Sequence, residues 1–184
     1  VQHGASFAES AAKSGAVAIL TDKTGSEIAP TIPALIVKDV RSAAGLASAW
    51  LYDEPMRSLD AVGVTGTNGK TTVTYLVHQL LMKAGRESGL IGTIESRIGL
   101  ERIESSRTTP EAADLQALSA VMRERHMRHL VMEVSSHSIA LKRIKGSFFK
   151  VLAFTNLTQD HLDFHPSMEH YFQTKASLFT QEYG

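Results

Sequence analysis

The chain has 184 residues, of which 43% are hydrophobic and 21% charged, a composition typical of a globular protein with one or two domains. Nineteen basic residues balance nineteen acidic ones, so no net charge favours binding to nucleic acid or to an anionic membrane. The absence of cysteine excludes disulfide bonds and cysteine-bound zinc, and it fits a reducing, cytoplasmic compartment.

The first third of the sequence predicts a small α/β unit. Residues 5–14 have the periodicity of a helix, and the apolar run AVAIL at 16–20 indicates a strand. Glycine and proline residues predict a loop over 22–33. A second buried strand is expected at ALIV (34–37), followed by an alanine-rich helix over 39–51.

The polar segment 52–60, which contains Pro55, is predicted to separate two domains. We therefore expect one domain over residues 1–58 and a second over residues 59–184. Because the chain starts at Val1 and stops directly after a helical pattern, we expect it to be a piece of a longer protein.

Strands and helices alternate through the rest of the chain. This alternation predicts an α/β fold with a mostly parallel sheet and helices on both of its faces. Ligands of such sheets bind at the carboxyl ends of the strands, here just after Val64, Val134 and Phe154. The expected strands cover residues 61–64, 87–92, 93–99, 129–134 and 150–156, and the expected helices cover residues 70–84, 110–126 and 167–180.

The segment GVTGTNGKTTV joins an expected strand to an expected helix, as a phosphate-binding loop does. The common pattern would place a glycine at Val64, so the spacing differs. Gly66 and Gly69 still allow the backbone to approach a phosphate closely, and the helix N-terminus behind them attracts anions. Lys70 can reach the outer phosphates and Thr71 can bind magnesium, whereas a purely structural turn needs neither side chain.

Glu133 lies at the carboxyl end of the apolar strand in the segment VMEVSSHS. A buried carboxylate is costly unless it is paired or bound to a cation. Either a nearby arginine or a magnesium ion opposite Thr71 would satisfy it, since magnesium prefers hard oxygen ligands.

The segment NLTQDHLDFH follows the next strand and brings Asp160, His161, Asp163 and His165 together. The spacing of the two histidines would suit a zinc site on a helix, but Pro166 and the preceding turn residues argue against one continuous helix. A solvated polar loop is the alternative. The remaining isolated histidines are interpreted as surface or packing residues: His3, His78, His126, His129 and His170.

Lys175 falls on the apolar stripe of the last expected helix. Its amine either extends outward to solvent or is partly desolvated, which would lower its pKa and make it a nucleophile. A neutral lysine amine can add CO₂ to form a carbamate, which offers oxygen ligands to a metal ion.

Five segments in order resemble the Mur ligases, ATP-dependent ligases that build the peptide of bacterial cell-wall precursors. The segments are GVTGTNGKTT, RTTPEA, MEVSSHSI, FTNLTQDHLDFH and MEHYFQTKASLF, and they are most similar to those of the ligases that add the third amino acid. The loop of this family also lacks the glycine missing at Val64. Residues 1–58 would then be part of an N-terminal UDP-sugar-binding domain, and residues 59–184 the first part of a central, P-loop-type ATP-binding domain.

The resemblance also implies site residues. ATP would bind the loop residues Gly66, Thr67, Asn68, Gly69, Lys70, Thr71 and Thr72. One Mg²⁺ would bind Thr71 and Glu133, and a second would bind His161 and Lys175 as its carbamate. The UDP-sugar dipeptide would contact Thr108, Thr109, Ser135 and Arg143, and catalysis would depend on Lys70, Lys175 and His161. One departure is Leu141, where many relatives have a glutamine that contacts the substrate.

The implied function is ATP-dependent formation of an amide bond. A cytoplasmic, monomeric ligase would join diaminopimelate or lysine to UDP-N-acetylmuramoyl-L-alanyl-D-glutamate through an acyl phosphate, in peptidoglycan precursor synthesis. The alternatives are another Mur or folylpolyglutamate-type ligase, a metal-dependent hydrolase centred on Asp160, His161 and His165, or a nucleotide-binding fragment without turnover. Since the domain that selects the amino acid is missing, we expect residues 1–184 alone neither to ligate nor to bind ATP tightly.

Overall fold

The structure is a computed structural model that describes residues 2–103, 108–180 and 183. The chain separates into two compact units, residues 1–44 and 45–184, and the division falls within helix α3 (Val40–Leu51). The expected boundary between functional domains, residues 58 and 59, remains a prediction, because the compactness of a segment does not establish what it binds.

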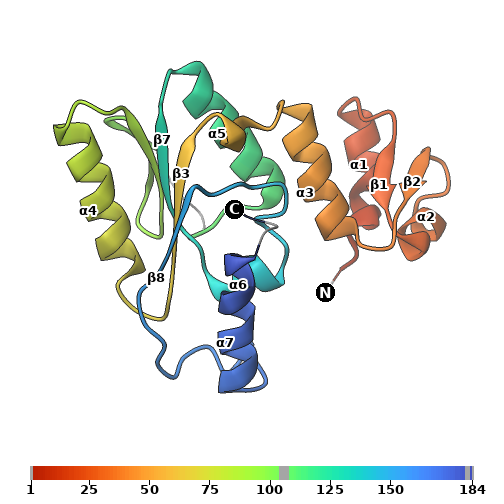
Figure 1. The fold of residues 1–184 in the computed structure, drawn as a ribbon. Coiled ribbons are helices and arrows are strands. Elements are labelled where there is room, and N and C mark those ends of the chain that lie inside the picture. The colour runs from red at the N-terminus through yellow and green to blue at the C-terminus, as the bar shows by residue number, and fades with distance from the viewer. Residues whose placement is uncertain (1, 104–107, 181–182, 184) are drawn as a thin grey trace. The chain divides into compact units, whose positions relative to one another are not determined.

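The first unit has a two-stranded parallel sheet with short helices (Figure 1). The loop expected over 22–33 is wrong, because α2 lies within it; the Asp22 carboxylate accepts a hydrogen bond from Gly25 N at 2.8 Å and caps this helix. The strand at 34–36 is exposed instead of buried. An apolar run in a sequence does not show whether other residues pack over it. The elements are the 3₁₀ helix η1 (Gly4–Phe7), α1 (Ala8–Lys13), β1 (Ile19–Thr21), α2 (Lys23–Ile28), β2 (Ala34–Ile36) and the start of α3.

The second unit is built on a six-stranded sheet of order β6-β5-β4-β7-β3-β8. Strands β4, β7, β3 and β8 are parallel, while β5 and β6 are antiparallel to their neighbours, so the expected mostly parallel α/β sheet is confirmed. The strands are β3 (Asp60–Thr65), β4 (Ser88–Ile91), β5 (Ser96–Ile98), β6 (Glu101–Ile103), β7 (His129–Glu133) and β8 (Val151–Phe154). The helices are η2 (Pro55–Arg57), α4 (Lys70–Lys83), α5 (Ala112–Glu124), α6 (Ser136–Ala140), α7 (Met168–Ala176) and η3 (Ser177–Phe179).

Helices cover both faces of the central strands (Figure 1). Helix α4 packs against β3, β4 and β7. On the other face, Met122 of α5 lies so close to Gly89 of β4 that a Cβ there would be 2.4 Å from its sulfur. The buried core of this unit includes Leu115, Leu130 and Met132. Within the described residues, none of the helices has both the length and the apolar character needed to cross a membrane.

Several further details differ from the expected elements. Strand β6 was not expected, and β1 covers Ile19–Thr21 instead of residues 16–20. Helix α5 starts at Ala112, after Pro110 and the N-cap Glu111, instead of at Pro110. Helix α6 was not expected, and it forms because the Ser135 hydroxyl caps it by accepting a hydrogen bond from Ser138 N at 3.1 Å. Strand β8 covers Val151–Phe154 instead of residues 150–156, and it is only partly buried because it is the last strand of the sheet.

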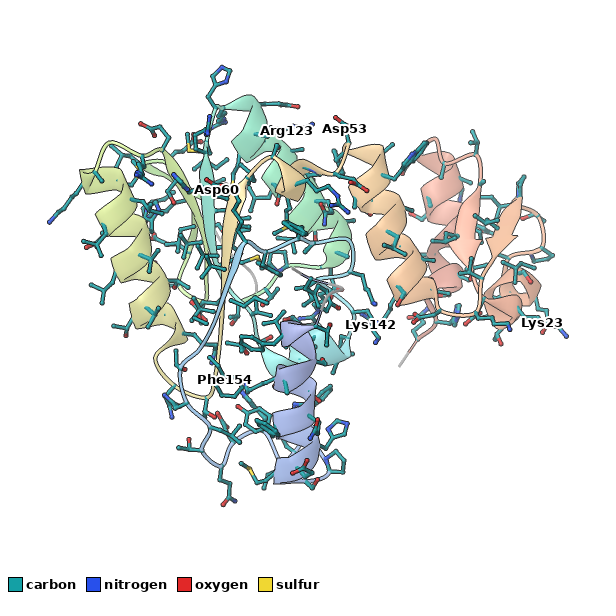
Figure 2. The ribbon with its side chains drawn as sticks, viewed as in Figure 1. Lys23, Asp53, Asp60, Arg123, Lys142 and Phe154 are labelled. Atoms are coloured by element: carbon teal, nitrogen blue, oxygen red, sulfur yellow. The ribbon has the colours of Figure 1, made fainter. Side chains whose placement is uncertain are left out.

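The parallel strands give the sheet an amino end and a carboxyl end. Figure 2 labels Asp60, at the start of β3, and Phe154, at the end of the parallel neighbour β8, and the two lie at opposite ends of the strands. The carboxyl ends of β3, β4, β7 and β8 therefore lie on the same side of the sheet as Phe154. Side chains that follow these strands are brought together there.

Candidate functional site

The phosphate loop, residues 66–72, follows β3 and is tied to the segment after β8. The Thr155 hydroxyl donates to Asn68 O at 2.7 Å, and the Asn156 amide donates to the same oxygen at 3.1 Å. Gly66 has a φ of +139°, and a Cβ at this position would lie 2.0 Å from Thr155 Oγ1. A glycine is therefore required where the loop passes this segment.

Lys70, the first residue of α4, turns its amine back over the phosphate loop. Its Nζ donates to Gly66 O at 3.0 Å and to Thr67 O at 2.8 Å. Burial lowers the pKa of Lys70, while the charges of Glu133 and Asp160 oppose this shift. The ammonium is thus held at the loop by carbonyl oxygens, and no carboxylate of the described residues is bonded to it.

Glu133 is 1% exposed at the end of β7, as expected for a carboxylate at a buried strand end. Oε2 accepts hydrogen bonds from the hydroxyls of Thr71 at 3.1 Å and Thr93 at 3.0 Å, and Oε1 accepts one from Thr93 N at 2.8 Å. Its hydrogen-bond partners among the described residues are uncharged groups and not the arginine that the sequence left open. The hydroxyl of α4 and the carboxylate of β7 therefore present oxygen atoms to the same place.

The residues expected to contact a UDP-sugar substrate lie beside this pair. The Thr109 hydroxyl donates to Glu133 O at 2.9 Å, and Ser135 N donates to Thr109 Oγ1 at 3.4 Å. The Arg143 guanidinium Nε lies 3.0 Å from Glu111 Oε1. Thr109 is 1% exposed, so its role within this structure is to connect the end of β7 to the segment before α5.

His161 follows β8 and has a left-handed backbone, with a φ of +53°. This conformation costs about 1–2 kcal/mol for a residue with a Cβ, and such residues concentrate at functional sites. The His161 ring packs edge-on against His137 with 4.8 Å between ring centres, and Nε2 lies 3.5 Å from Asp160 Oδ2. The ring is therefore held beside the cavity by aromatic packing and one carboxylate.

His165 has a different environment. It is fully buried, its Nε2 lies 2.9 Å from Ser136 Oγ, and its Nδ1 lies 2.9 Å from His170 Nδ1. Burial, followed by the charge of His170, lowers its pKa. The solvated loop that the sequence left open is therefore wrong for His165, which joins this loop to α6 and α7. Across residues 2–103, 108–180 and 183, no group of three or more acidic or histidine side chains is arranged to hold a metal ion.

Lys175 is buried, as the apolar stripe allowed, with 1% of its surface exposed. Its Nζ donates to Gly66 O at 2.9 Å and lies 4.6 Å from the centre of the Tyr171 ring. Burial and the nearby charge of Lys70 lower its pKa to about 8, although Asp160 opposes this shift. A substantial fraction of this amine is therefore neutral slightly above neutral pH, whereas an amine extended into solvent would stay charged.

Many of these groups line one cavity of about 600 Å³ at the carboxyl ends of the strands. The expectation that polar residues after β3, β7 and β8 meet there is confirmed. Gly66, Thr72 and Lys175 do not line the cavity. Lys175 contacts the phosphate loop through Gly66 O, the oxygen that also accepts a hydrogen bond from Lys70. The lining residues are Thr67, Asn68, Gly69, Lys70, Thr71, Thr93, Thr108, Thr109, Glu133, Ser135, His137, Arg143 and His161.

Three residues of the site were not expected from the sequence. Thr93 contacts Glu133, His137 packs against His161, and Tyr171 lies 3.2 Å from the Thr67 hydroxyl through its own hydroxyl. Thr93 follows β4, so the rule that ligands bind after parallel strands could have identified it. His137 and Tyr171 lie on helices, and their roles depend on packing that a sequence pattern does not specify.

Known proteins with similar sequences identify the family of this chain. A family model described as the Mur ligase middle domain matches residues 64–183. The UDP-N-acetylmuramoyl-L-alanyl-D-glutamate–2,6-diaminopimelate ligase of Streptomyces coelicolor is 53% identical over 180 residues, which are 97% of this chain and 35% of that protein. The protein of the same name from Corynebacterium glutamicum is 51% identical over 181 residues, with 96% and 35% covered.

A solved structure of a UDP-N-acetylmuramoyl-L-alanyl-D-glutamate–2,6-diaminopimelate ligase superimposes with a TM-score of 0.82 at 27% sequence identity. The match covers 95% of this chain and 35% of the solved chain. This chain thus spans about a third of the length of the curated relatives that it matches. Since the family model covers most of the chain, including the phosphate loop, Glu133 and Lys175, the chain belongs to the Mur ligase family.

Proposed function

We propose that this chain is part of an ATP-dependent ligase that adds the third amino acid to UDP-N-acetylmuramoyl-L-alanyl-D-glutamate. The observation that carries the proposal is the meeting of Lys70, Thr71 and Glu133 with Thr108 and Arg143 around one cavity. Nucleotide chemistry and recognition of an anionic acceptor are thereby possible at adjacent positions. The names of the relatives favour diaminopimelate over lysine as the added residue.

The phosphate loop is proposed to bind the triphosphate of ATP. Backbone N–H groups at the start of α4 attract anions, and the Lys70 ammonium needs to move only from loop carbonyls to phosphate oxygens. Four residues are proposed to bind the UDP-sugar dipeptide: Thr108, Thr109, Ser135 and Arg143. Residues 1–58 are proposed to belong to a UDP-sugar-binding domain, and residues 59–184 to an ATP-binding domain.

The site has groups that suit two magnesium ions. The Thr71 hydroxyl and the Glu133 carboxylate offer hard oxygen atoms 3.1 Å apart, which fits a first ion. His161 and Lys175 both lie beside the Tyr171 ring, at 6.1 Å between ring centres and 4.6 Å from Nζ, and a carbamate on Lys175 would complete a second site. When bound, magnesium would offset negative charge on the phosphates.

The residues of this chain would contribute mainly by positioning two substrates. Lys70 offsets charge on the γ-phosphate as the glutamate carboxylate of the acceptor attacks phosphorus and ADP leaves, forming an acyl phosphate. The amine of the incoming amino acid then attacks the acyl carbon. Phosphate leaves, the nitrogen loses a proton, and an amide bond results. The cavity keeps the acceptor beside the triphosphate, which lowers the entropic cost of the first step.

The experiment that tests the proposal measures phosphate release by the complete polypeptide that carries this chain. We expect release that requires ATP, Mg²⁺, UDP-N-acetylmuramoyl-L-Ala-D-Glu and diaminopimelate together, and a new amide product by mass spectrometry. Residues 1–184 alone are expected to show no turnover. Hydrolysis with zinc or manganese in the absence of ATP would instead support the hydrolase, which is disfavoured because both ring nitrogens of His165 contact other side chains.

A carbamate on Lys175 leads to a separate prediction. In the complete polypeptide, Lys175→Ala should lower kcat by about 100-fold, because the proposed carbamate, a ligand for magnesium near the phosphates, is lost. Added acetate should restore part of the activity, whereas Lys175→Arg should stay impaired, since it keeps the charge but cannot form a carbamate. Because the pKa is about 8, the neutral amine and hence the carbamate should increase as pH rises from 7 to 9.

The carbamate itself can be observed by carbon NMR after labelling with ¹³C-bicarbonate. We expect a carbamate signal from the wild-type polypeptide that is absent from Lys175→Ala. Full activity of Lys175→Arg would contradict the proposed role.

A further inference from the structure

Thr93 contacts both oxygens of Glu133, although it belongs to none of the motifs. Its N–H donates to Oε1 at 2.8 Å, and its hydroxyl oxygen lies 3.0 Å from Oε2. The same hydroxyl lies 3.1 Å from the hydroxyl oxygen of Thr108. One residue therefore lies between the strand-end carboxylate and a threonine on the side proposed for the UDP-sugar dipeptide.

The direction of these hydrogen bonds follows from the groups involved. A carboxylate only accepts, and a hydroxyl has a single proton to donate. If Thr93 donates its proton to Glu133, it can only accept from Thr108. The Thr71 hydroxyl donates to the same Glu133 oxygen at 3.1 Å. The hydroxyls of Thr108, Thr93 and Thr71 are thus connected through one carboxylate.

A tight turn holds Thr93 in this place. Gly92 N donates to Glu95 O at 3.2 Å, which closes the turn after β4. A Cβ on Gly92 would lie 2.7 Å from Glu133 Oε1, so glycine allows the close approach. The Glu95 side chain is buried and accepts a hydrogen bond from the Tyr75 hydroxyl of α4 at 2.9 Å. The turn is therefore anchored on the same helix that carries Thr71.

We infer that Thr93 is a positioning residue that holds Glu133 and couples the acceptor side of the site, through Thr108, to the nucleotide side. If the Thr71 oxygen binds a metal ion, the Thr71 hydroxyl can lose its hydrogen bond to Glu133. The two hydrogen bonds from Thr93 still fix both carboxylate oxygens. This inference rests on the proposed function, because it assigns the carboxylate to a site for magnesium and nucleotide.

The test measures the affinity of the complete polypeptide for AMP-PNP, a non-hydrolysable ATP analogue, with Mg²⁺ by calorimetry. Thr93→Val removes the hydroxyl but keeps the shape and the N–H, and it should weaken binding about tenfold, as expected for one hydrogen bond to a charged group. Thr93→Ser keeps the hydroxyl and should bind within about twofold of the wild type. The matched control is Thr180→Val, a threonine whose hydroxyl donates only to Ser177 O within the described residues.

A double-mutant cycle tests whether the effect of Thr108 on nucleotide affinity depends on the Thr93 hydroxyl. Thr108→Val should weaken AMP-PNP binding about threefold in the wild type and have no further effect in Thr93→Val, because its effect passes through that hydroxyl. An unchanged affinity in Thr108→Val overturns the coupling, and this variant leaves the turn itself intact even if Thr93→Val folds poorly. Equal affinities of Thr93→Val and the wild type overturn this inference but leave the proposed function standing. A wild type that does not bind Mg²⁺–AMP-PNP overturns the proposed function.

Discussion

Glu133→Gln should lower kcat/KM for ATP by about 1000-fold in the complete polypeptide while leaving it folded. Glutamine has nearly the shape of glutamate and can still accept a hydrogen bond from Thr93 N, so the end of β7 should keep its structure. It lacks the negative charge that a magnesium ion needs, and loss of electrostatic stabilisation of this kind typically costs two to three orders of magnitude in rate. The measurement is phosphate release as a function of ATP and Mg²⁺ concentration.

The matched control is Glu124→Gln, which makes the same chemical change at an exposed position on α5. It should leave both activity and melting temperature unchanged. If Glu133→Gln retains the wild-type dependence on Mg²⁺, this carboxylate is not part of the metal site. A large loss of melting temperature in Glu133→Gln would instead assign the carboxylate a structural role at the end of β7.

Gly66→Ala should abolish measurable binding of Mg²⁺–AMP-PNP and lower the melting temperature. The new Cβ would lie 2.0 Å from Thr155 Oγ1 and 3.1 Å from Asn156 N, and the φ of +139° disfavours any residue with a Cβ. Strain and overpacking together should cost about 2–4 kcal/mol unless the loop moves. Movement would displace the carbonyl of Gly66, which accepts hydrogen bonds from Lys70 and Lys175.

Gly69→Ala is the comparison, because it places the same methyl group in the same loop. Apart from its neighbours in the chain, no described residue has an atom within 4 Å of that Cβ. Only the φ of +83° is unfavourable, so binding should weaken about tenfold. Adding Thr155→Ala to Gly66→Ala removes the closest clash and should recover part of the affinity. Equal effects of the two glycine substitutions would show that close approach to the segment after β8 is unimportant.

Local chemistry made much of the site predictable. Gly66, Gly69 and Lys70 lie within five consecutive residues, and their spacing alone indicates a loop before a helix. Glu133 could be placed at a strand end because an apolar run precedes it. By contrast, the short helix α2 was missed, because a cap such as Asp22 is a weak signal in a sequence. Strand β2 was expected at the right place but as a buried strand, because an apolar run does not show whether other residues cover it.

The sequence by itself determined the alternation of the longer strands and helices, the phosphate loop and the family resemblance, because these depend on neighbouring residues. Only the tertiary structure decided which partners Glu133 has and how deeply Lys175 is buried. Thr93 reaches Glu133 across 40 residues of chain, and Lys175 reaches Gly66 across 109. Such contacts arise when parallel strands bring their carboxyl ends to one edge, and desolvation there lowers the pKa of a lysine that would otherwise stay charged.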